Sequence, residues 1–468
     1  MAVYNIVKLS ELEGAKRIDA EYYKPEYFID FSKRNWKPIK NFLEICQYGI
    51  SQAMVEEPKG YPIFRMDDIK DCFLLDDEVK YLELPEQVFL QYKLEVNDIL
   101  FNRVNSEEFV GRTGIFKLKG DYVFASYLIR LRLKPNSEIL PDYLNIFLNT
   151  KYGIKQIRKF SRRAVNQANV NAEELKNFKI CVIPLGIQQH IRKLSDEAWN
   201  KIELSKSLYS QAENLLLEEL GFKDFKPQYR KTYTAKLSDT FASHRIDAEY
   251  FQPAYEEVIE KIKEYPNGFD KLLKCVENVK PNFDPTKYPE KIFSYVELAD
   301  IDSSIGVIHS ENKIKGDEAP SRARRMLKEN DVIVSSVEGS LEKVALVDEK
   351  HDGSLASTGF FQFRPLNILP EVLLILSKSI VLQSQLKKRC SGTILIAVPK
   401  ESLRDIIIPL LPFETQQKIA SLVQQSHEAR RKAKELLEVA KRAVEIAIEK
   451  NEKEALEYIQ RFYSSLGL

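Results

Sequence analysis

The chain has 468 residues, enough for about three domains, and its 44% hydrophobic content allows sizeable cores. Its net charge of +1 excludes a strong overall positive field, so any nucleic-acid site must come from local clusters of basic residues. The longest apolar run, near Leu373, is interrupted by Ser377 and Lys378 and is too short to cross a bilayer. The start does not resemble a signal peptide and the five cysteines form no CxxC pair, which predicts reduced thiols and a cytoplasmic protein.

The sequence repeats itself at an offset of about 228 residues. The offset is 228 at the arm, rises to 233 in the middle of the copy and returns to 228 near its end. The matched segments are Lys8-Leu9-Ser10 with Lys236-Leu237-Ser238, Arg17–Tyr23 with Arg245–Phe251, Asn97-Asp98 with Asn330-Asp331, and Leu175 with Leu403. Such self-similarity indicates one structural unit used twice, with small insertions in the middle of each copy.

Each copy is predicted to be a small α/β globule. Short alternating apolar segments bounded by Pro, Gly and Asn predict strands. They are 61–69, 98–103, 113–118, 128–133 and 178–183 in the first copy, and 292–298, 331–336, 344–347, 360–363 and 406–411 in the second. One helix is expected after the fourth strand of each copy, beginning at Pro141 or Pro370, because proline is favoured in the first turn of a helix.

Each copy ends in a long helix that begins after Pro184 or Pro412 with a Gln-Gln-x-Ile sequence. Apolar or small residues recur every three or four positions from Ile191 to Leu220 and from Ile419 to Ala447, which is the pattern of helices that pack lengthwise. The second helix is expected to continue from 414 to 466 as a rod of about 70 Å, with a solvated face that includes Arg430. The predicted fold is α/β (α+β): two duplicated globules separated by two long antiparallel coiled-coil helices, with pseudo-two-fold symmetry. The predicted boundaries are globules 1–185 and 241–412, helices 186–221 and 413–468, and a linker 222–240.

The two copies differ most in two polar loops of each globule. One loop follows the strand that begins at Asn97-Asp98 or Asn330-Asp331, and the other, 158–169 or 387–393, follows the predicted helix. Arg, Lys, Asn, Gln and Ser are the side chains that contact phosphates and base edges. A basic cluster is usually a solvated surface, but matched and divergent loops of this composition make nucleic-acid reading an equal alternative. Arg65 lies on a strand, where it can equally be a sheet-face residue, as can Arg130 and Arg132. The candidate DNA-binding residues are Arg65, Arg103, Asn105, Arg112, Arg162, Arg163, Asn166, Gln167, Asn169, Arg322, Arg324, Arg325, Ser336, Glu338, Lys343, Lys388, Arg389 and Thr393.

The order and duplication of these motifs resemble the specificity (S, or HsdS) subunit of type I restriction–modification systems. The resemblance rests on the Pro-x-x-x-Gln-Gln-x-Ile helices, the 60–66 strand, the Asn-Asp strands and Ser391-Gly392-Thr393, and it covers essentially the whole chain. It implies two target-recognition domains that each read half of a split DNA sequence, and helices that act as spacer and docking platform. It also implies two adenine-N6 methyltransferase subunits as partners, which carry the S-adenosylmethionine, and two endonuclease/translocase subunits in the full complex. Ser161-Arg162-Arg163 departs from the Ser-Gly-Thr pattern, and the second helix runs about a dozen residues beyond the first.

The chain itself is expected to be non-enzymatic, with no cofactor or metal. It has no Gly-x-Gly, no Asn/Asp-Pro-Pro-Tyr/Phe methyltransferase motif and no Walker Gly-x-x-x-x-Gly-Lys, and its five histidines lack metal-ligand spacing. Pro141-Asp142 and Glu174-x-Lys176 are better explained as helix starts than as a nuclease site. Three alternatives stay open. They are a specificity subunit of a type IIB-like system with fused methyltransferase and nuclease, a coiled-coil scaffold without nucleic acid, and an enzyme whose site has no recognised motif.

Overall fold

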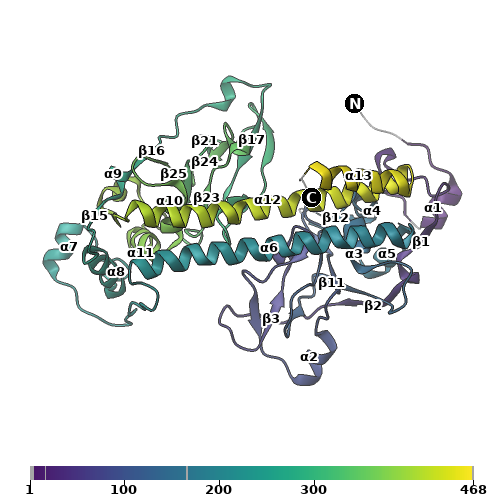
Figure 1. Cartoon of the computed structure of the whole chain (residues 1–468), viewed down its shortest axis with the longest axis horizontal. Helices are drawn as coiled ribbons and strands as arrows, with labels where there is room; N and C mark the ends of the chain where they lie inside the picture. Colours follow the sequence, from purple (N-terminus) through teal and green to yellow (C-terminus); the bar gives the residue numbers. More distant parts are fainter. Residues whose placement is uncertain (1–4, 16, 165–166, 466–468) are drawn as a thin grey trace. The chain divides into compact units, whose positions relative to one another are not determined.

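The computed structural model describes residues 5–15, 17–164 and 167–465, with only the backbone of 13–15, 163 and 164. The chain divides into two compact units: unit 1 comprises 1–202 and 431–468, and unit 2 comprises 203–430. Each unit includes part of each of two long helices, α6 (Leu185–Glu219) and α12 (Phe413–Glu449) (Figure 1). Both units mix helices and strands, as predicted, whereas the pseudo-two-fold relation between the globules stays a prediction.

Unit 1 is built on a six-stranded sheet with the order β2-β11-β7-β9-β5-β4. The central strand β7 is buried along its whole length because Ile99, Leu100 and Phe101 are packed on both faces of the sheet. The strands of unit 1 are β1 (Trp36–Pro38), β2 (Leu43–Tyr48), β3 (Tyr61–Phe64), β4 (Ile69–Lys70), β5 (Phe73–Leu74), β6 (Lys80–Leu82), β7 (Ile99–Asn102), β8 (Val104–Asn105), β9 (Thr113–Ile115), β10 (Val123–Phe124), β11 (Leu128–Leu133), β12 (Arg162–Ala164), β13 (Gln167–Asn169) and β14 (Lys179–Cys181).

Unit 2 repeats this topology. Its six-stranded sheet has the order β16-β25-β22-β23-β19-β18, in which each strand takes the place of its counterpart in unit 1. A second sheet in each unit contains one parallel pair, β3 with β10 and β17 with β24. The strands of unit 2 are β15 (Phe269–Lys271), β16 (Val276–Asn278), β17 (Ile292–Val296), β18 (Ile301–Asp302), β19 (Val307–Ile308), β20 (Asn312–Lys315), β21 (Ala323–Met326), β22 (Val332–Ser335), β23 (Val344–Leu346), β24 (Leu355–Ser357), β25 (Phe360–Pro365) and β26 (Ile407–Pro409).

The Asn-Asp pairs mark the same turn in both copies. Asn97 and Asn330 have φ of 76° and 70°, a left-handed conformation that asparagine tolerates. The following carboxylate, fully buried, accepts two hydrogen bonds from one arginine of the neighbouring strand. Asp98 binds Arg132 at 2.7 Å and 2.7 Å, and Asp331 binds Arg364 at 2.9 Å and 3.0 Å. Arg132 is therefore a structural residue of the sheet.

Two helices stand where the sequence predicts one. A buried helix that begins at the predicted proline, α3 or α10, is followed directly by a more polar second helix, α4 or α11. The remaining helices include the pair α1 and α7 at the start of each copy. Apart from α6 and α12, the helices are α1 (Leu9–Ala15), α2 (Glu86–Tyr92), α3 (Pro141–Leu148), α4 (Lys151–Phe160), α5 (Ala172–Lys176), α7 (Leu237–Ser243), α8 (Pro253–Lys263), α9 (Leu272–Cys275), α10 (Pro370–Lys378), α11 (Ile380–Arg389) and α13 (Glu452–Ser465).

The first glutamine of each Gln-Gln pair joins the long helix to its globule. The Gln188 side chain accepts a hydrogen bond from the backbone N–H of Leu140 at 2.8 Å and donates to the carbonyl of Ile183 at 2.8 Å. Gln416 does the same with Leu369 at 3.1 Å and Leu411 at 3.0 Å. The motif therefore satisfies backbone groups at the start of α3 or α10, which have no partner within those helices.

The arm of each copy is fixed on the end of α4 or α11 by an identical set of contacts. Arg17 donates to the carbonyl of Phe160 at 3.1 Å, and Arg245 donates to the carbonyl of Cys390 at 2.9 Å. The same arginine lies over a tyrosine ring whose other cationic neighbour is a lysine of the second helix. The ring contacts are Arg17 and Lys159 with Tyr22 at 4.9 Å and 4.7 Å, and Arg245 and Lys388 with Tyr250 at 4.8 Å and 4.6 Å.

Within each unit the two long helices pack along the predicted apolar seam. In unit 2 they run antiparallel, since Ser205 contacts Ser426 at 3.1 Å and Glu219 contacts Thr415 at 3.5 Å. In unit 1 residues of α6 from Ile187 to Ile202 share one core with residues of α12 from Ala433 to Ile448. The prediction that Arg430 is solvated is wrong: its side chain is buried and lies 3.6 Å from the carboxylate of Asp302.

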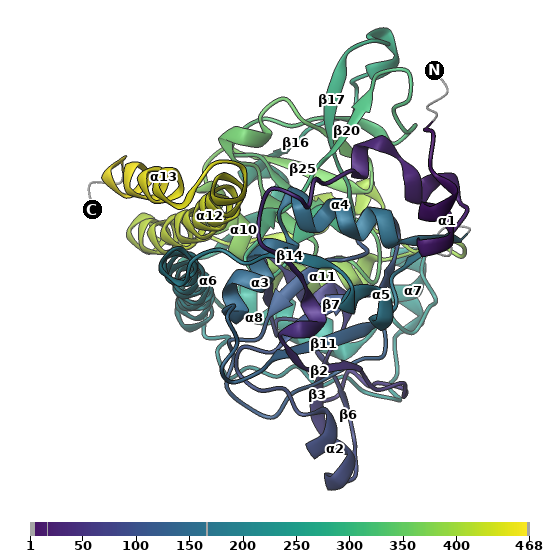
Figure 2. The ribbon, with the colours of Figure 1, turned by 90° about the vertical axis from the view of Figure 1, so that its right-hand side faces the viewer.

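The prediction of one continuous helix from 414 to 466 is also wrong. The helix ends at Glu449, and the Asn451 side chain accepts a hydrogen bond from the N–H of Glu454 at 3.0 Å, which begins α13. Tyr463 donates to Glu197 at 2.8 Å, and Ala455 and Ile459 are buried in the core of unit 1. The extra residues therefore fold back against α6 (Figures 1 and 2).

No helix in the described part of the chain has an apolar stretch long enough to cross a bilayer. Among the same residues, no group of three or more His, Cys, Asp or Glu side chains is arranged to hold a metal ion. The five cysteines are free thiols, and all except Cys46 are buried.

Candidate nucleic-acid interface

The two divergent loops of unit 1 are joined into one three-stranded ribbon. Strand β13 pairs with β12 on one side and with β8 on the other, with Ala168 opposite Asn105 and Asn169 opposite Val104. The N–H of Val170 also donates to the carbonyl of Arg103 at 3.0 Å. We call β8, β12 and β13 ribbon 1. Residues more than fifty positions apart in the sequence are thereby brought onto one surface.

Ribbon 1 presents amide and guanidinium groups. Gln167 and Arg162 are exposed, and Arg162 forms an ion pair with Glu174 at 2.9 Å that leaves 64% of its side chain accessible. Asn105 is half-buried, and its side-chain oxygen accepts a hydrogen bond from the N–H of Ser106 at 2.8 Å. Asn169 is half-buried in β13. Of the other predicted residues here, the side chain of Arg163 and the whole of Asn166 lie outside the described residues.

Two arginines flank ribbon 1. Arg112 is exposed and lies over the ring of Phe109 at 3.9 Å, so an aromatic face holds its guanidinium in place. Arg103 is half-buried and lies over Tyr48 at 4.9 Å. Arg65, by contrast, caps a short 3₁₀ turn: its guanidinium contacts Asp68 at 3.2 Å and donates to the carbonyl of Glu78 at 2.8 Å. Arg65 therefore has a structural task beside any contact with DNA.

Unit 2 builds the equivalent ribbon from different residues. Ser391 and Ala397 pair with each other, and Ala397 also pairs with Val337. The N–H of Glu338 donates to the carbonyl of Ile396 at 3.0 Å, and the N–H of Val398 donates to Ser336 at 2.8 Å. We call 336–338 together with 391–397 ribbon 2. It joins the same two loops at the same place in the fold as ribbon 1.

The tip of ribbon 2 is apolar where the sequence suggested a polar loop. Thr393 is exposed, and the next residues, Ile394 and Leu395, are exposed as well, Ile394 fully. The sequence analysis missed these residues because it selected polar side chains only. The signal was present: three apolar residues follow Ser-Gly-Thr directly, in a segment with no other indication of a core strand.

Two predicted DNA contacts of unit 2 have structural roles instead. Lys388 and Arg389 lie in the last turn of α11 and not in a loop, and both are buried. Lys388 forms an ion pair with Glu256 and lies over Tyr250, as Lys159 does over Tyr22. Arg389 donates to the carbonyls of Gln385 and Asp405 at 2.9 Å each, and burial lowers its pKa. Both residues are therefore left out of the interface proposed below.

The arginine cluster 322–325 is split by the strand on which it lies. Arg322 is exposed, whereas Arg324 binds Asp284 at 2.5 Å. Arg325 points to the other face of β21, is buried, and donates to the carbonyl of Val279 at 2.7 Å. Burial lowers the pKa of Arg325 to about 10. Of the three arginines, Arg322 is therefore the exposed one, whereas Arg324 and Arg325 bind groups of unit 2.

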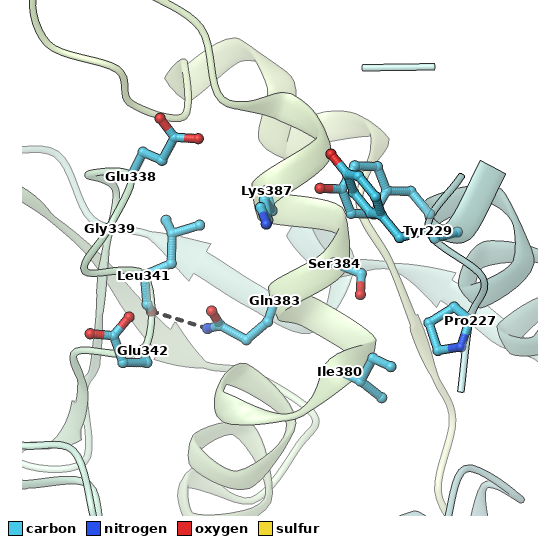
Figure 3. A pocket seen from close by; sticks show the side chains of 12 residues that line it. Pro227, Tyr229, Glu338, Gly339, Leu341, Glu342, Ile380, Gln383, Ser384 and Lys387 are labelled. Atoms are coloured by element: carbon cyan, nitrogen blue, oxygen red, sulfur yellow. Dashed lines mark hydrogen bonds between the residues drawn. The ribbon is translucent and has the colours of Figure 1, made fainter. Parts of the chain in front are cut away.

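The remaining predicted residues of unit 2 line or border ribbon 2. Ser336 donates to the carbonyl of Gly359 at 2.8 Å, and Lys343 lies 3.2 Å from the hydroxyl of Ser303. Glu338 lines a cavity of about 580 Å³ between the loop 338–342, α11 and the linker. Figure 3 shows Glu338 and Glu342 on one side of this cavity, Pro227 and Tyr229 on the other, and Gln383 and Lys387 of α11 between them. Two carboxylates make this cavity unsuited to phosphate.

Comparison with known proteins identifies the first part of the chain. The type I restriction modification DNA specificity domain matches residues 33–214. This segment is similar to that domain. The matched segment contains the whole of ribbon 1, the glutamine contacts at the start of α6 and most of that helix.

Curated relatives carry the same description. The specificity subunit assigned to the type I restriction enzyme MjaX of Methanocaldococcus jannaschii is 30% identical over 190 residues, which are 39% of this chain and 44% of that protein. The EcoKI specificity subunit of Escherichia coli K12 is 23% identical over 247 residues, 52% of this chain and 50% of that protein. The chain thus spans about half the length of the curated relatives it matches.

Solved specificity subunits align along most of the chain at low similarity. The S subunit from M. genitalium is 14% identical with a TM-score of 0.39, covering 89% of this chain and 97% of that one. The HsdS subunit from Thermoanaerobacter tengcongensis is 13% identical with a TM-score of 0.28, covering 90% and 97%. Within the present chain, the specificity domain of unit 1 has a topological twin in unit 2.

Proposed function

We propose that this chain is the DNA-recognition subunit of a type I restriction–modification complex, with one target-recognition globule in each unit. The observation that carries the proposal is the pairing of the two divergent loops into one ribbon in each globule, on a framework that is otherwise the same. A framework that stays constant while its paired loops differ suits a protein that reads two different half-sites with one architecture. Globules 1–185 and 241–412 are the proposed reading domains.

Ribbon 1 supplies the groups that direct readout requires. Amides and guanidinium groups form bidentate hydrogen bonds with base edges in the major groove, and the exposed Gln167, Arg162 and Arg112 are of this kind. In unit 2 we propose contacts from Arg322, Ser336 and Thr393. Ser336 and Thr393 belong to ribbon 2, and their hydroxyl side chains are shorter than the amide and guanidinium side chains of ribbon 1. Because the tip of ribbon 2 is apolar, we expect it to contact thymine methyl groups of its half-site as well as to form hydrogen bonds.

The helices 186–221 and 413–468 are proposed to set the spacing between half-sites and to support two adenine-N6 methyltransferase subunits. The methyltransferase subunits would supply S-adenosylmethionine and the pocket for the flipped adenine. The chain's own contribution is to bind and orient the duplex. The net charge of +1 gives it little non-specific attraction for DNA, which favours recognition by the whole assembly.

Half-site specificity tests the proposal. The complex of the chain with its methyltransferase subunits would methylate a random DNA library, and the methylated motif would be read by sequencing. Replacing Arg112 and Gln167 by alanine is expected to relax one half-site, at about 1–3 kcal/mol for each lost base contact, and to leave the other unchanged. Replacing Arg322 and Thr393 by alanine is expected to do the reverse.

A matched control is Lys274→Ala, which removes an exposed cation of α9 that pairs with Asp270 at 2.9 Å and belongs to neither ribbon. It should leave the methylated motif unchanged. The proposal would be contradicted if either double variant lost sequence preference at both half-sites, or if both double variants methylated the same motif as the wild type.

A further inference from the structure

The two arms expose the same apolar side chains in both copies. In the first arm Leu9 is 69% and Ile18 89% exposed, and in the second arm Leu237 is 70% and Ile246 90% exposed. Leu9 and Leu237 are 228 positions apart in the sequence, and so are Ile18 and Ile246. Single exposed apolar residues are ordinary on protein surfaces, so neither arm alone would need an explanation. An explanation is needed because both residues recur at the same positions and with nearly the same exposure.

The fold itself does not require these side chains. The neighbouring arm residues are fixed by internal bonds: Arg17 contacts Asp19 at 2.7 Å, and the Asp19 carboxylate accepts from the N–H of Tyr22 at 3.2 Å. Arg245 and Asp247 make the same contacts in the second arm, at 2.5 Å and at 3.0 Å to Tyr250. Those contacts explain why Arg, Asp and Tyr recur. They do not explain Ile18 and Ile246, whose side chains extend into solvent.

Hydrogen bonds around the isoleucine hold the backbone of the first arm in place; the second arm keeps those of Arg245 and Asp247, but Phe251 stands where the first arm has Tyr23. Arg17 is tied to the end of α4, and Tyr23 donates to the carbonyl of Arg17 at 2.9 Å and lies 3.4 Å from the carbonyl of Glu11 in α1. Since the backbone before and after Ile18 is held in this way, a partner would lose little conformational entropy in ordering it. Pre-organisation of this kind is typical of binding surfaces.

We infer that the two arms are docking sites for two copies of one protein subunit, with Leu9 and Ile18 entering an apolar recess of one copy and Leu237 and Ile246 the same recess of the other. The inference rests on the proposed function, because it takes the two copies to be the methyltransferase subunits. A partner that binds twice through one surface requires two equal surfaces on this chain. The arms expose the same apolar side chains, whereas the ribbons, which are proposed to meet two different half-sites, differ.

Charge argues against DNA as the occupant of the arms. Each exposed isoleucine is followed by an aspartate whose side chain is 44% exposed, Asp19 and Asp247. Each carboxylate is paired with an arginine of its own arm, so the pair has no net charge that would attract phosphate, whereas a protein recess can offer a hydrogen-bond donor to the exposed carboxylate. An arm surface that served DNA would also be expected to diverge with the half-sites.

The test uses the full chain co-purified with the adenine-N6 methyltransferase subunit of the same system, with mass photometry to count the copies bound. The wild type is expected to bind two copies. Ile18→Asp and Ile246→Asp are each expected to bind one, with affinity at the altered arm at least tenfold weaker, and the double variant none. Ile18→Val should restore two copies, because it retains an apolar branched side chain.

The controls are Leu90→Asp in α2 and Leu366→Asp after β25, two leucines outside the arms that are 63% exposed, nearly as much as Leu9 and Leu237. Unchanged thermal unfolding of every variant excludes misfolding. Two copies bound by the double variant, with affinity within twofold of the wild type, would overturn the inference and leave the proposed function intact. A wild-type chain that binds no methyltransferase subunit would overturn both. A shift of the isolated chain from dimer to monomer in the arm variants would assign the arms to self-association and overturn the inference as well.

Discussion

Ribbon 1 and ribbon 2 differ, while the scaffolds that hold them are nearly the same. The scaffold of each unit contains a buried Asp–Arg pair, a glutamine that joins the long helix to its globule, and a tyrosine between two cations. In the ribbons, the hairpin of amides and guanidinium groups in unit 1 stands where unit 2 has a short loop with an apolar tip. The two copies therefore share the bonds that the fold needs and differ at residues that the fold does not need.

The largest effect is expected from the buried carboxylates. Asp98→Ala and Asp331→Ala should each lower the free energy of unfolding of their own unit by about 3 kcal/mol, because the arginine loses both hydrogen bonds to the buried carboxylate and retains a more exposed glutamate, Glu95 or Glu277. Urea denaturation gives the size of the loss, and hydrogen exchange shows which unit is affected. Glu435→Ala, which breaks the exposed Arg431–Glu435 pair, should cost less than about 0.5 kcal/mol. A loss confined to one of the two aspartate variants would show that the scaffolds are not equivalent.

A smaller effect, and an unequal one, is expected from the glutamines. Gln188 is fully buried and Gln416 is half-buried. Water can therefore replace some of the side-chain hydrogen bonds lost in a Gln416 variant, but not those lost in a Gln188 variant. Gln188→Ala should cost about 2 kcal/mol and Gln416→Ala about 1 kcal/mol. The exposed neighbour Gln189→Ala serves as the control and should leave the urea midpoint unchanged. Equal losses in both variants would contradict the role assigned to burial.

The smallest effect is expected from the tyrosines of the arms. Tyr22→Leu and Tyr250→Leu should each cost about 1 kcal/mol, because the two cations lose the aromatic face between them. Tyr22→Phe and Tyr250→Phe retain that face and should cost clearly less. Thermal unfolding at low and high salt measures the difference. A leucine variant as stable as its phenylalanine counterpart would mean that the ring contributes packing area alone.

Periodic features of the chain could be predicted from sequence because each depends on neighbours along the chain. The apolar seam, the strands that follow Asn97 and Asn330, and the duplication itself are of this kind. The burial of Lys388 and Arg389 could not be predicted in this way, because it depends on α11 packing against α8 and the arm. Comparing the copies would have improved the prediction, because Lys159, the twin of Lys388, also lies in the last turn of a helix and over a repeated tyrosine.

The break after Glu449 and the joining of the loops have different physical origins. The second long helix has no Pro or Gly at its break, and the capping bond of Asn451 to the N–H of Glu454 is a short local signal that competes with continued helix. The ribbons depend on pairing between segments that are far apart in sequence, such as Ala168 with Asn105. Comparing the copies identified the loops as divergent, but it could not show that they form one surface, and selecting polar residues missed the apolar tip of ribbon 2.

The contact of Ser205 with Ser426 has a consequence for how this chain can change. The two hydroxyls face each other in an otherwise apolar seam, and Ser426 also donates to the carbonyl of Ser205 at 2.7 Å. Sliding one helix by a turn would oppose a hydroxyl to residues such as Val423 or Ala429, which offer no side-chain acceptor. The serine pair therefore resists an insertion or deletion in either helix alone. Viable length variants of this protein should arise in matched pairs, with the same number of residues gained or lost in α6 and in α12.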